Sequence, residues 1–105
     1  MNRYCMATMS LTVLLAAASI ASADRVNVTI DGLKYNPATI EIAAGDTVVW
    51  TNNDDREHTV TADDGSFDSK RLAKGKTFSR TFSKPGRYTY GSDPSPRTKG
   101  TVVVK

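Results

Sequence analysis

Apolar residues recur at every second position over most of this 105-residue chain. Val26, Val28 and Ile30 form one such series, and Phe78 and Phe82, which flank Arg80, belong to a later alternating run. This alternation is typical of β-strands that have one buried face and one solvated face. Because no stretch of helical length shows an apolar period of 3.6 residues, the pattern predicts an all-β protein.

Turn residues divide the alternating pattern into short strands. Gly45-Asp46, Asp63-Asp64-Gly65 and Pro85-Gly86 are such turns, and signals of this kind arrive about every eight to twelve residues, as in β-sandwiches. The expected strands lie near 26–30, 40–42, 47–50, 58–61, 78–82, 87–90 and 100–104. A loop over residues 91–99 would join the last two. The sequence therefore predicts a Greek-key antiparallel β-sandwich.

Within such a sandwich, the aromatic residues of the strands belong in the core. Trp50, Tyr88 and Tyr90 could in another context stack on a base or a sugar, but their place in alternating strands favours core packing. The final apolar run, residues 102–104, would be prone to aggregation as a free edge, so we expect neighbouring strands to cover it.

Residues 1–23 have the features of a secretory signal peptide. Arg3 makes the start positive, residues 11–18 are apolar, and residues 21–23 read Ala-Ser-Ala, a small-residue cleavage site. The apolar run is too short to span a bilayer as a helix. We expect cleavage after Ala23, a single mature domain over residues 24–105 without a membrane anchor, and a location in the periplasm or outside the cell.

The sulfur-containing residues all lie in the predicted leader. The one cysteine, Cys5, and the three methionines are within residues 1–23, and His58 is the only histidine of the chain. A mature domain of residues 24–105 would therefore have neither a disulfide nor a thiolate. The net charge of +3, with interspersed signs, gives no indication of nucleic-acid binding.

Basic residues are concentrated between positions 70 and 87. They are Lys70, Arg71, Lys74, Lys76, Arg80, Lys84 and Arg87. Since apolar residues at core-like spacing are interleaved with them, we interpret this stretch as one solvated face. A docking patch for an acidic protein is the alternative.

An ordered set of motifs runs through the middle and the end of the chain. It comprises Tyr35-Asn36-Pro37, Ile40, Gly45-Asp46-Thr47-Val48-Val49-Trp50-Thr51-Asn52, Asp54, His58-Thr59-Val60, Pro85-Gly86, Tyr88, Tyr90 and Gly100-Thr101-Val102-Val103-Val104. In this order the set resembles the cupredoxins, the small blue-copper proteins that include amicyanin and plastocyanin. The resemblance covers nearly all of residues 24–105.

The resemblance implies a one-electron carrier in which two histidines, a cysteine thiolate and a distant axial methionine hold copper. It implies that His58 is the first histidine. The other three ligands of the family come from the loop after the Tyr-x-Tyr strand, which here is the segment 91–100. In this register Ser92 stands at the cysteine position, Ser95 at the second histidine and Thr98 at the methionine.

Three hydroxyl groups cannot reproduce a blue-copper site. Hydroxyls are hard ligands and nearly unionised at neutral pH, whereas copper in this geometry needs a thiolate. With His58 as the single surviving ligand position, we expect no bound cofactor, although copper is the family cofactor. The hypothesis is a monomeric, non-redox binding or interaction module, not an enzyme, with a periplasmic protein as its partner.

Other interpretations of the same residues remain open at this point. His58 could be a hydrogen-bonded structural residue, or part of a weak copper or zinc site with the Asp24 amine or with Asp54, Asp55 and Glu57, which are otherwise turn formers. A copper-dependent electron carrier, the family function, would need ligands from another chain or from an unrelated cofactor. Hydrolysis by Ser92 or Ser95 is the least favoured hypothesis, because only one histidine, His58, could activate them. A nucleophile also needs that base to be oriented and needs an oxyanion site.

The departures from the family pattern are concentrated in residues 91–98. One local event explains this better than scattered drift: a redesigned loop, a paralogue with a new loop, or two compensating frameshifts. Arg97 adds a charge where the family usually has an apolar residue around the copper.

Overall fold

The computed structural model describes residues 23–105, and every regular element among them is a β-strand. The strands are β1 (Arg25–Asp31), β2 (Lys34–Asn36), β3 (Thr39–Ile42), β4 (Thr47–Asn52), β5 (Thr61–Ala62), β6 (Thr77–Thr81), β7 (Gly86–Ser92) and β8 (Ser95–Val104). The predicted leader residues, including Cys5, lie outside the described part, apart from Ala23.

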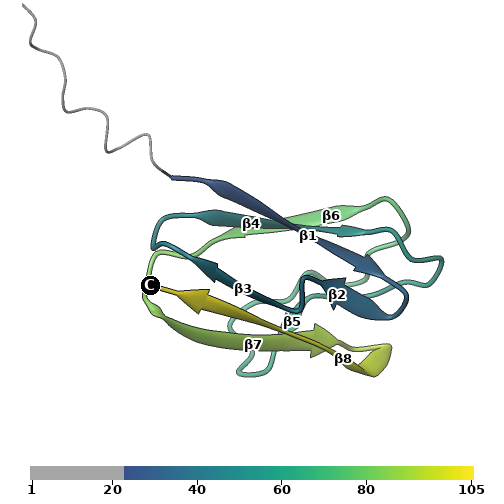
Figure 1. Ribbon diagram of the computed structural model, residues 1–105. Helices are drawn as coiled ribbons and strands as arrows, with labels where there is room; N and C mark the ends of the chain where they lie inside the picture. The colour runs from purple at the N-terminus through teal and green to yellow at the C-terminus, as the bar shows by residue number, and fades with distance from the viewer. Residues whose placement is uncertain (1–22) are drawn as a thin grey trace, which may run out of the picture.

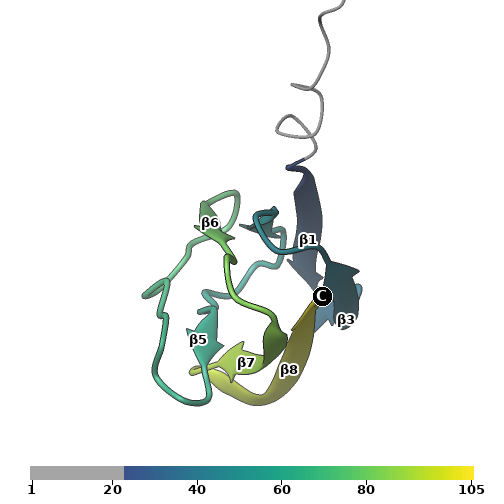
Figure 2. The ribbon, with the colours of Figure 1, turned by 90° about the vertical axis from the view of Figure 1, so that its left-hand side faces the viewer.

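The strands form two four-stranded sheets that pack face to face. One sheet has the order β2-β1-β4-β6 and the other has the order β3-β8-β7-β5. Figure 1 shows the two layers along their length, and Figure 2 shows them from one end, with β6 and β1 on one side and β5, β7 and β8 on the other. The predicted β-sandwich is confirmed.

Both sheets are mixed. β1 runs parallel to β4, with Val28 opposite Trp50, and β3 runs parallel to β8, with Ile40 opposite Val102. The other strand pairs are antiparallel. The alternation of side chains follows from the pleat of a single strand, so it has the same period whichever direction the neighbour runs. The predicted antiparallel pairing therefore holds for most strand pairs but not for these two.

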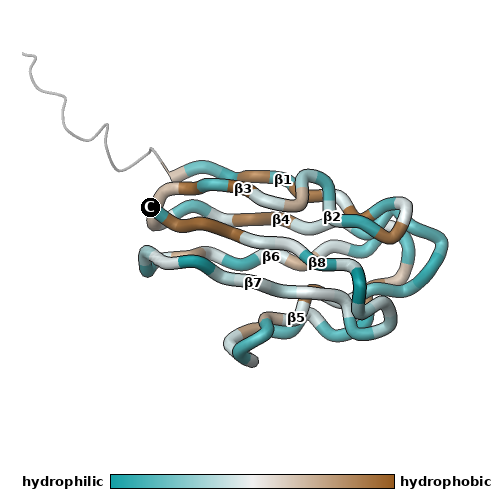
Figure 3. The backbone as a smooth tube through the Cα atoms, turned by 60° about the horizontal axis from the view of Figure 1, so that its bottom comes forward, coloured by the Kyte–Doolittle hydropathy of each residue, from teal (hydrophilic) through white to brown (hydrophobic). Residues whose placement is uncertain are grey.

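The core lies between the sheets, where the alternating residues meet. Figure 3 shows apolar residues spaced along β1 and β4 and concentrated in the last part of β8. Trp50 and Tyr90 are fully buried, and the Trp50 Nε1 atom donates a hydrogen bond to the Tyr90 hydroxyl at 3.1 Å. Tyr88 is partly buried against this core. The predicted core role of the three aromatic residues is confirmed.

The strand that was a potential aggregation edge is covered on both sides. β8 lies between β3 and β7, so its backbone pairs with two neighbours. Gly100 in β8 is a point of close approach, because a Cβ atom there would collide with the Tyr90 ring. A glycine is therefore needed where β8 passes over this buried tyrosine.

The predicted basic face is exposed to solvent with one exception. Lys70, Lys76 and Lys84 are exposed, whereas Arg80 is half-buried. The Arg80 guanidinium carbon lies 5.0 Å from the centre of the Phe67 ring and 5.5 Å from that of Phe82, which is cation–π geometry.

Two local predictions are wrong. No strand covers residues 58–61: β5 contains only Thr61 and Ala62, and His58 forms an isolated bridge with Leu72. The reason is that the N–H groups of Thr59 and Val60 donate to side-chain hydroxyls, those of Ser92 and Ser69, instead of to a neighbouring strand.

The second wrong prediction is the long loop over residues 91–99. β7 continues to Ser92 and β8 begins at Ser95, so only Asp93 and Pro94 separate the two strands. The ladder continues through the segment, with Gly91 opposite Lys99 and a register irregularity at Gly91/Ser92. This tight hairpin carries the residues of the candidate site.

Candidate functional site

His58 is held in place by its own backbone and by a buried asparagine. Its N–H donates to the Leu72 carbonyl at 3.2 Å, and the Leu72 N–H donates to the His58 carbonyl at 2.7 Å. The side-chain amide of Asn52 donates to the carbonyls of Arg56 and Leu72, both at 2.8 Å, and its oxygen accepts the Asp54 N–H at 2.9 Å. The segment 52–58 thus folds around Asn52 and turns Asp54 back towards His58.

Both nitrogens of the buried His58 ring have hydrogen-bond partners. Nε2 lies 2.9 Å from Asp54 Oδ2, and Nδ1 lies 2.9 Å from Ser92 Oγ. An ionised carboxylate can only accept, so Nε2 carries a hydrogen. In the neutral imidazole Nδ1 is then the acceptor, and the Ser92 hydroxyl donates to it. This assignment follows from the bonding partners.

Asp54 is held in its ionised form. The hydrogen bond from His58, followed by the one from the Leu33 N–H, holds the pKa of the Asp54 carboxyl below its ordinary value. The Leu33 N–H donates to Asp54 Oδ2 at 3.1 Å. One carboxylate oxygen therefore serves both the buried imidazole and a backbone N–H from the turn before β2.

The Ser92 hydroxyl also binds the backbone next to His58. Its Oγ atom accepts the Thr59 N–H at 3.3 Å, and the Asp93 N–H donates to Thr59 Oγ1 at 2.9 Å. Ser92 is 3% exposed. These bonds attach the start of the hairpin to the segment that carries the histidine.

Ser95 and Thr98 contact each other instead of His58. Their hydroxyl oxygens are 2.8 Å apart, and Thr98 Oγ1 donates to the Leu33 carbonyl at 2.7 Å. Since the single hydroxyl hydrogen of Thr98 is directed at that carbonyl, Ser95 is the donor within the pair. Leu33 thus joins the two halves, with its N–H on Asp54 and its carbonyl on Thr98.

The comparisons with known proteins agree with this architecture. The family model described as "Cupredoxin-like domain" matches residues 4–104. This chain belongs to the cupredoxin-like family. It is 33% identical over 110 residues to amicyanin-alpha of Methylorubrum extorquens, covering 95% of this chain and 92% of the relative.

Two further similarities extend the range of cupredoxins that it resembles. It is 33% identical over 98 residues to chloroplastic plastocyanin of Tetradesmus obliquus, covering 78% of this chain and 68% of that protein. Among solved structures, a purple cupredoxin from Nitrosopumilus maritimus superposes with a TM-score of 0.72 at 30% identity, covering 76% of this chain and 99% of the other.

The side chains at the four candidate ligand positions of this cupredoxin-like chain are one imidazole and three hydroxyls. The structure places the Ser92 hydroxyl directly against His58. Thr98, and through it Ser95, is linked to His58 only by way of the Leu33 peptide groups and the Asp54 carboxylate. Within residues 23–105, no group of three or more His, Cys, Asp or Glu side chains is arranged to hold a metal ion.

The other carboxylates near His58 in the sequence face basic partners. Asp55 lies 2.8 Å from Lys74 Nζ, and Glu57 lies 3.6 Å from Arg71 Nη1. Of the three acidic residues singled out from the sequence, only Asp54 reaches the histidine. The sequence offered one signal for this contact, an aspartate four residues before the histidine, but nothing pointed to the peptide group of Leu33.

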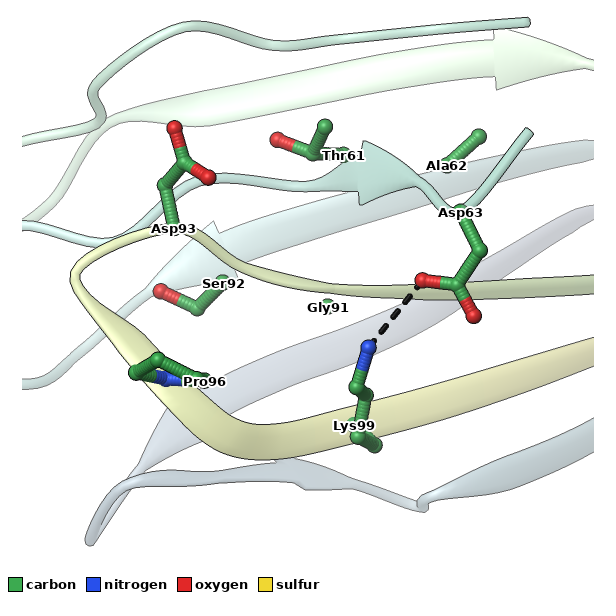
Figure 4. Close-up of a pocket in the computed structure, with 8 residues that line it drawn as sticks. All are labelled: Thr61, Ala62, Asp63, Gly91, Ser92, Asp93, Pro96 and Lys99. Carbon is green, nitrogen blue, oxygen red and sulfur yellow. Dashed lines mark hydrogen bonds and ion pairs between the residues drawn. The ribbon is translucent and has the colours of Figure 1, made fainter. Parts of the chain in front are cut away.

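A hollow of about 170 Å³ lies beside the hairpin and includes Ser92 in its wall. Figure 4 shows the ion pair between Lys99 and Asp63 on one side of this hollow, at 3.1 Å, and Ser92 and Asp93 on the other. The Thr89 hydroxyl, followed by Lys99, keeps the pKa of Asp63 below its ordinary value.

Among the described residues, no helix is long and apolar enough to cross a membrane.

Proposed function

We propose that this protein is a cupredoxin-fold binding module of the periplasm that does not carry a blue-copper centre. The observation that carries the proposal is the state of the His58 ring, whose two nitrogens are engaged by Asp54 and Ser92 at 2.9 Å each. The residue at the family's cysteine position thus completes a hydrogen-bond network around the imidazole.

Copper binding at His58 would break this hydrogen-bond network, and residues 24–105 have no thiolate ligand whose bond to copper would offset that loss. A copper ion on Nδ1 would displace the Ser92 hydroxyl, which also satisfies the buried Thr59 N–H. Losing a partner in the interior costs about 1–3 kcal/mol per buried group. Neutral hydroxyls supply neither the charge nor the soft character of a thiolate in return, so the residues present do not fit a blue-copper ion.

We further propose that residues 1–23 are removed on export and that the mature domain, residues 24–105, is a monomer that acts on a periplasmic protein partner. The leader pattern and the β-sandwich of the described residues support this. Fold alone does not identify the partner. We expect no nucleic-acid binding, because the chain has a small net charge with interspersed signs.

Asp54, His58 and Ser92 are hydrogen-bonded in the order of a carboxylate–histidine–serine catalytic triad, but their surroundings do not favour hydrolysis. Ser92 is buried and its oxygen already accepts the Thr59 N–H. The adjacent Asp93 N–H, a natural oxyanion donor, is bonded to Thr59 Oγ1. We therefore propose a non-enzymatic role.

Metal titration of the processed protein tests the proposal. We expect no intense visible absorption with Cu(II), no reversible one-electron couple, and no tight binding of Cu(I) or Zn(II) by calorimetry. One copper retained per purified monomer together with a reversible couple would instead establish the electron carrier of the wider family. Weak colourless binding that disappears in His58→Gln would indicate metal trafficking.

A further inference from the structure

At the end of the sandwich where β1 begins, a buried carboxylate has no cationic partner. Asp46 is 6% exposed, and within residues 23–105 no Lys, Arg or His nitrogen lies within 4.0 Å of its oxygens. Its Oδ2 atom accepts the Ala43 N–H at 2.9 Å, and its Oδ1 atom accepts the Asp24 N–H at 2.9 Å. These two backbone donors, Asp24 first, hold the pKa of Asp46 below its ordinary value, so the carboxyl is ionised at neutral pH.

The one basic residue in the wall of the hollow beside Asp46 is already engaged. Asp46 lies in the wall of a hollow of about 390 Å³ that also includes Asp24, Glu41 and Lys105. Lys105 Nζ lies 3.3 Å from Glu41 Oε1 at the rim. Apart from Asp24 itself, the hollow therefore has one acid with an ion-pair partner, Glu41, and one without, Asp46.

The Asp24 nitrogen is fixed against Asp46 by the start of the sheet. The Asp24 carbonyl accepts the Thr47 N–H at 2.8 Å, directly before the parallel pairing of Arg25 with Thr47. The nitrogen is thus anchored by strand pairing on one side and by the Asp46 carboxylate on the other. This atom is also the one that cleavage after Ala23 would convert from an amide nitrogen into an amine.

We propose that Asp46 is the binding site for the α-ammonium group that export processing creates at Asp24. The inference rests on the cleavage that belongs to the proposed function. A processing endopeptidase hydrolyses the Ala23–Asp24 peptide bond with one water molecule, which leaves a carboxyl group on Ala23 and an amine on Asp24. The carboxyl group releases a proton, and the amine takes up a proton at neutral pH, because α-amines have pKa values of about 7.7–8.0.

Processing then turns a hydrogen bond from a neutral amide to the ionised carboxylate into one between two charged groups, without moving a heavy atom. The same nitrogen and oxygen, 2.9 Å apart in the folded chain, become an ammonium–carboxylate pair. The mature domain gains stability that the uncleaved chain lacks. We expect cleavage to lower the unfolding equilibrium constant by about five- to tenfold, the range of a partly buried charged hydrogen bond.

The test separates the charge from the hydrogen bond. The full-length chain is exported, and the N-terminus of the purified product is determined by mass spectrometry, which should give Asp24. Selective acetylation of the α-amine then keeps one N–H donor but removes the charge. In urea titrations at pH 7 and low salt, the acetylated protein should unfold with a five- to tenfold larger equilibrium constant, close to that of the uncleaved chain.

Two variants identify the carboxylate responsible. In Asp46→Asn, acetylation should no longer change the equilibrium constant, because an amide oxygen accepts the bond without a charge. In Glu41→Gln, the matched control from the same hollow, the acetylation effect should persist. An N-terminus other than Asp24, an acetylated protein as stable as the free amine, or an effect lost in Glu41→Gln but retained in Asp46→Asn overturns the proposal. None of these outcomes bears on copper binding, which the metal titration decides separately.

Discussion

The hydroxyl oxygen of Ser92 lies 2.9 Å from Nδ1 of His58, a residue 34 positions earlier in the chain. Ser92 is at the end of β7, and His58 is in the irregular segment before β5. The contact is made where the two sheets bring these segments together. The proposed function takes this contact to stand where the cupredoxin resemblance implies a thiolate–copper–imidazole contact.

Removing this hydroxyl should destabilise the protein. Ser92→Ala leaves His58 Nδ1 and the Thr59 N–H without their partner in the buried interior. We expect a loss of about 1–3 kcal/mol in the free energy of unfolding, measured by urea titration. The exposed Ser83 provides the control, since Ser83→Ala should change stability by no more than about 0.5 kcal/mol. Equal effects of the two variants would contradict the role given to Ser92.

Stability should fall in acid because several aspartates have lowered pKa values in the folded state. Asp46, Asp54, Asp63 and Asp68 are among them. Near pH 4, the ordinary value for aspartate, the unfolded chain binds more protons than the folded one. The stabilisation is complete above that pH and is lost as the pH falls through the lower folded-state values. Urea midpoints measured between about pH 6 and pH 2 should decline below pH 4.

Asp54→Asn should reduce this acid dependence and lower stability at neutral pH. The charged acceptor for His58 Nε2 and for the Leu33 N–H becomes a neutral amide. Asp55→Asn is the neighbouring control, because Asp55 is exposed and pairs with the exposed Lys74. At pH 7 the first variant should be clearly less stable than the second. A cost at Asp55 as large as at Asp54 would show that the buried network contributes little.

Gly100→Ala should disrupt the packing of β8 on Tyr90. A methyl group at this position collides with the tyrosine ring, which is fully buried and packs edge-to-face with Trp50 and Tyr35. Overpacking of this kind costs about 1–3 kcal/mol, and occasionally more. The midpoint of thermal unfolding, with near-ultraviolet circular dichroism as a report on the aromatic cluster, measures it. An unchanged spectrum and midpoint would mean that the ring has room to move.

The combined substitution Ser92→Cys, Ser95→His and Thr98→Met should create a coloured copper site. The cysteine would take the place of the hydroxyl 2.9 Å from His58, and the other two ligands would enter at the positions that the family register assigns. Visible absorption after addition of Cu(II) measures the result. A variant with Ser83→Cys in place of Ser92→Cys should stay colourless. A colourless triple variant that remains folded would show that the register is wrong.

Much of the fold could be predicted from the sequence, because the two-residue alternation of apolar and polar side chains is a property of each strand by itself. Val28 and Ile30 alternate with polar residues, and both are buried as expected. The strand over 58–61 and the loop over 91–99 could not be predicted in the same way. The conformation of the first segment depends on which group from a distant segment accepts the hydrogen bond of the Thr59 N–H. That of the second depends on how far the β7–β8 ladder extends.

For the site, the sequence determined the chemistry and the tertiary structure determined the bonding. The one imidazole and the hydroxyls of Ser92, Ser95 and Thr98 are fixed by residue identity, and so is the absence of sulfur from residues 24–105. Only the packed sandwich decided that Ser92 binds His58, while Ser95 and Thr98 turn to Leu33. The reason is physical: a side chain's chemical character is a local property, but a hydrogen bond between buried groups depends on strands that meet only after the chain has folded.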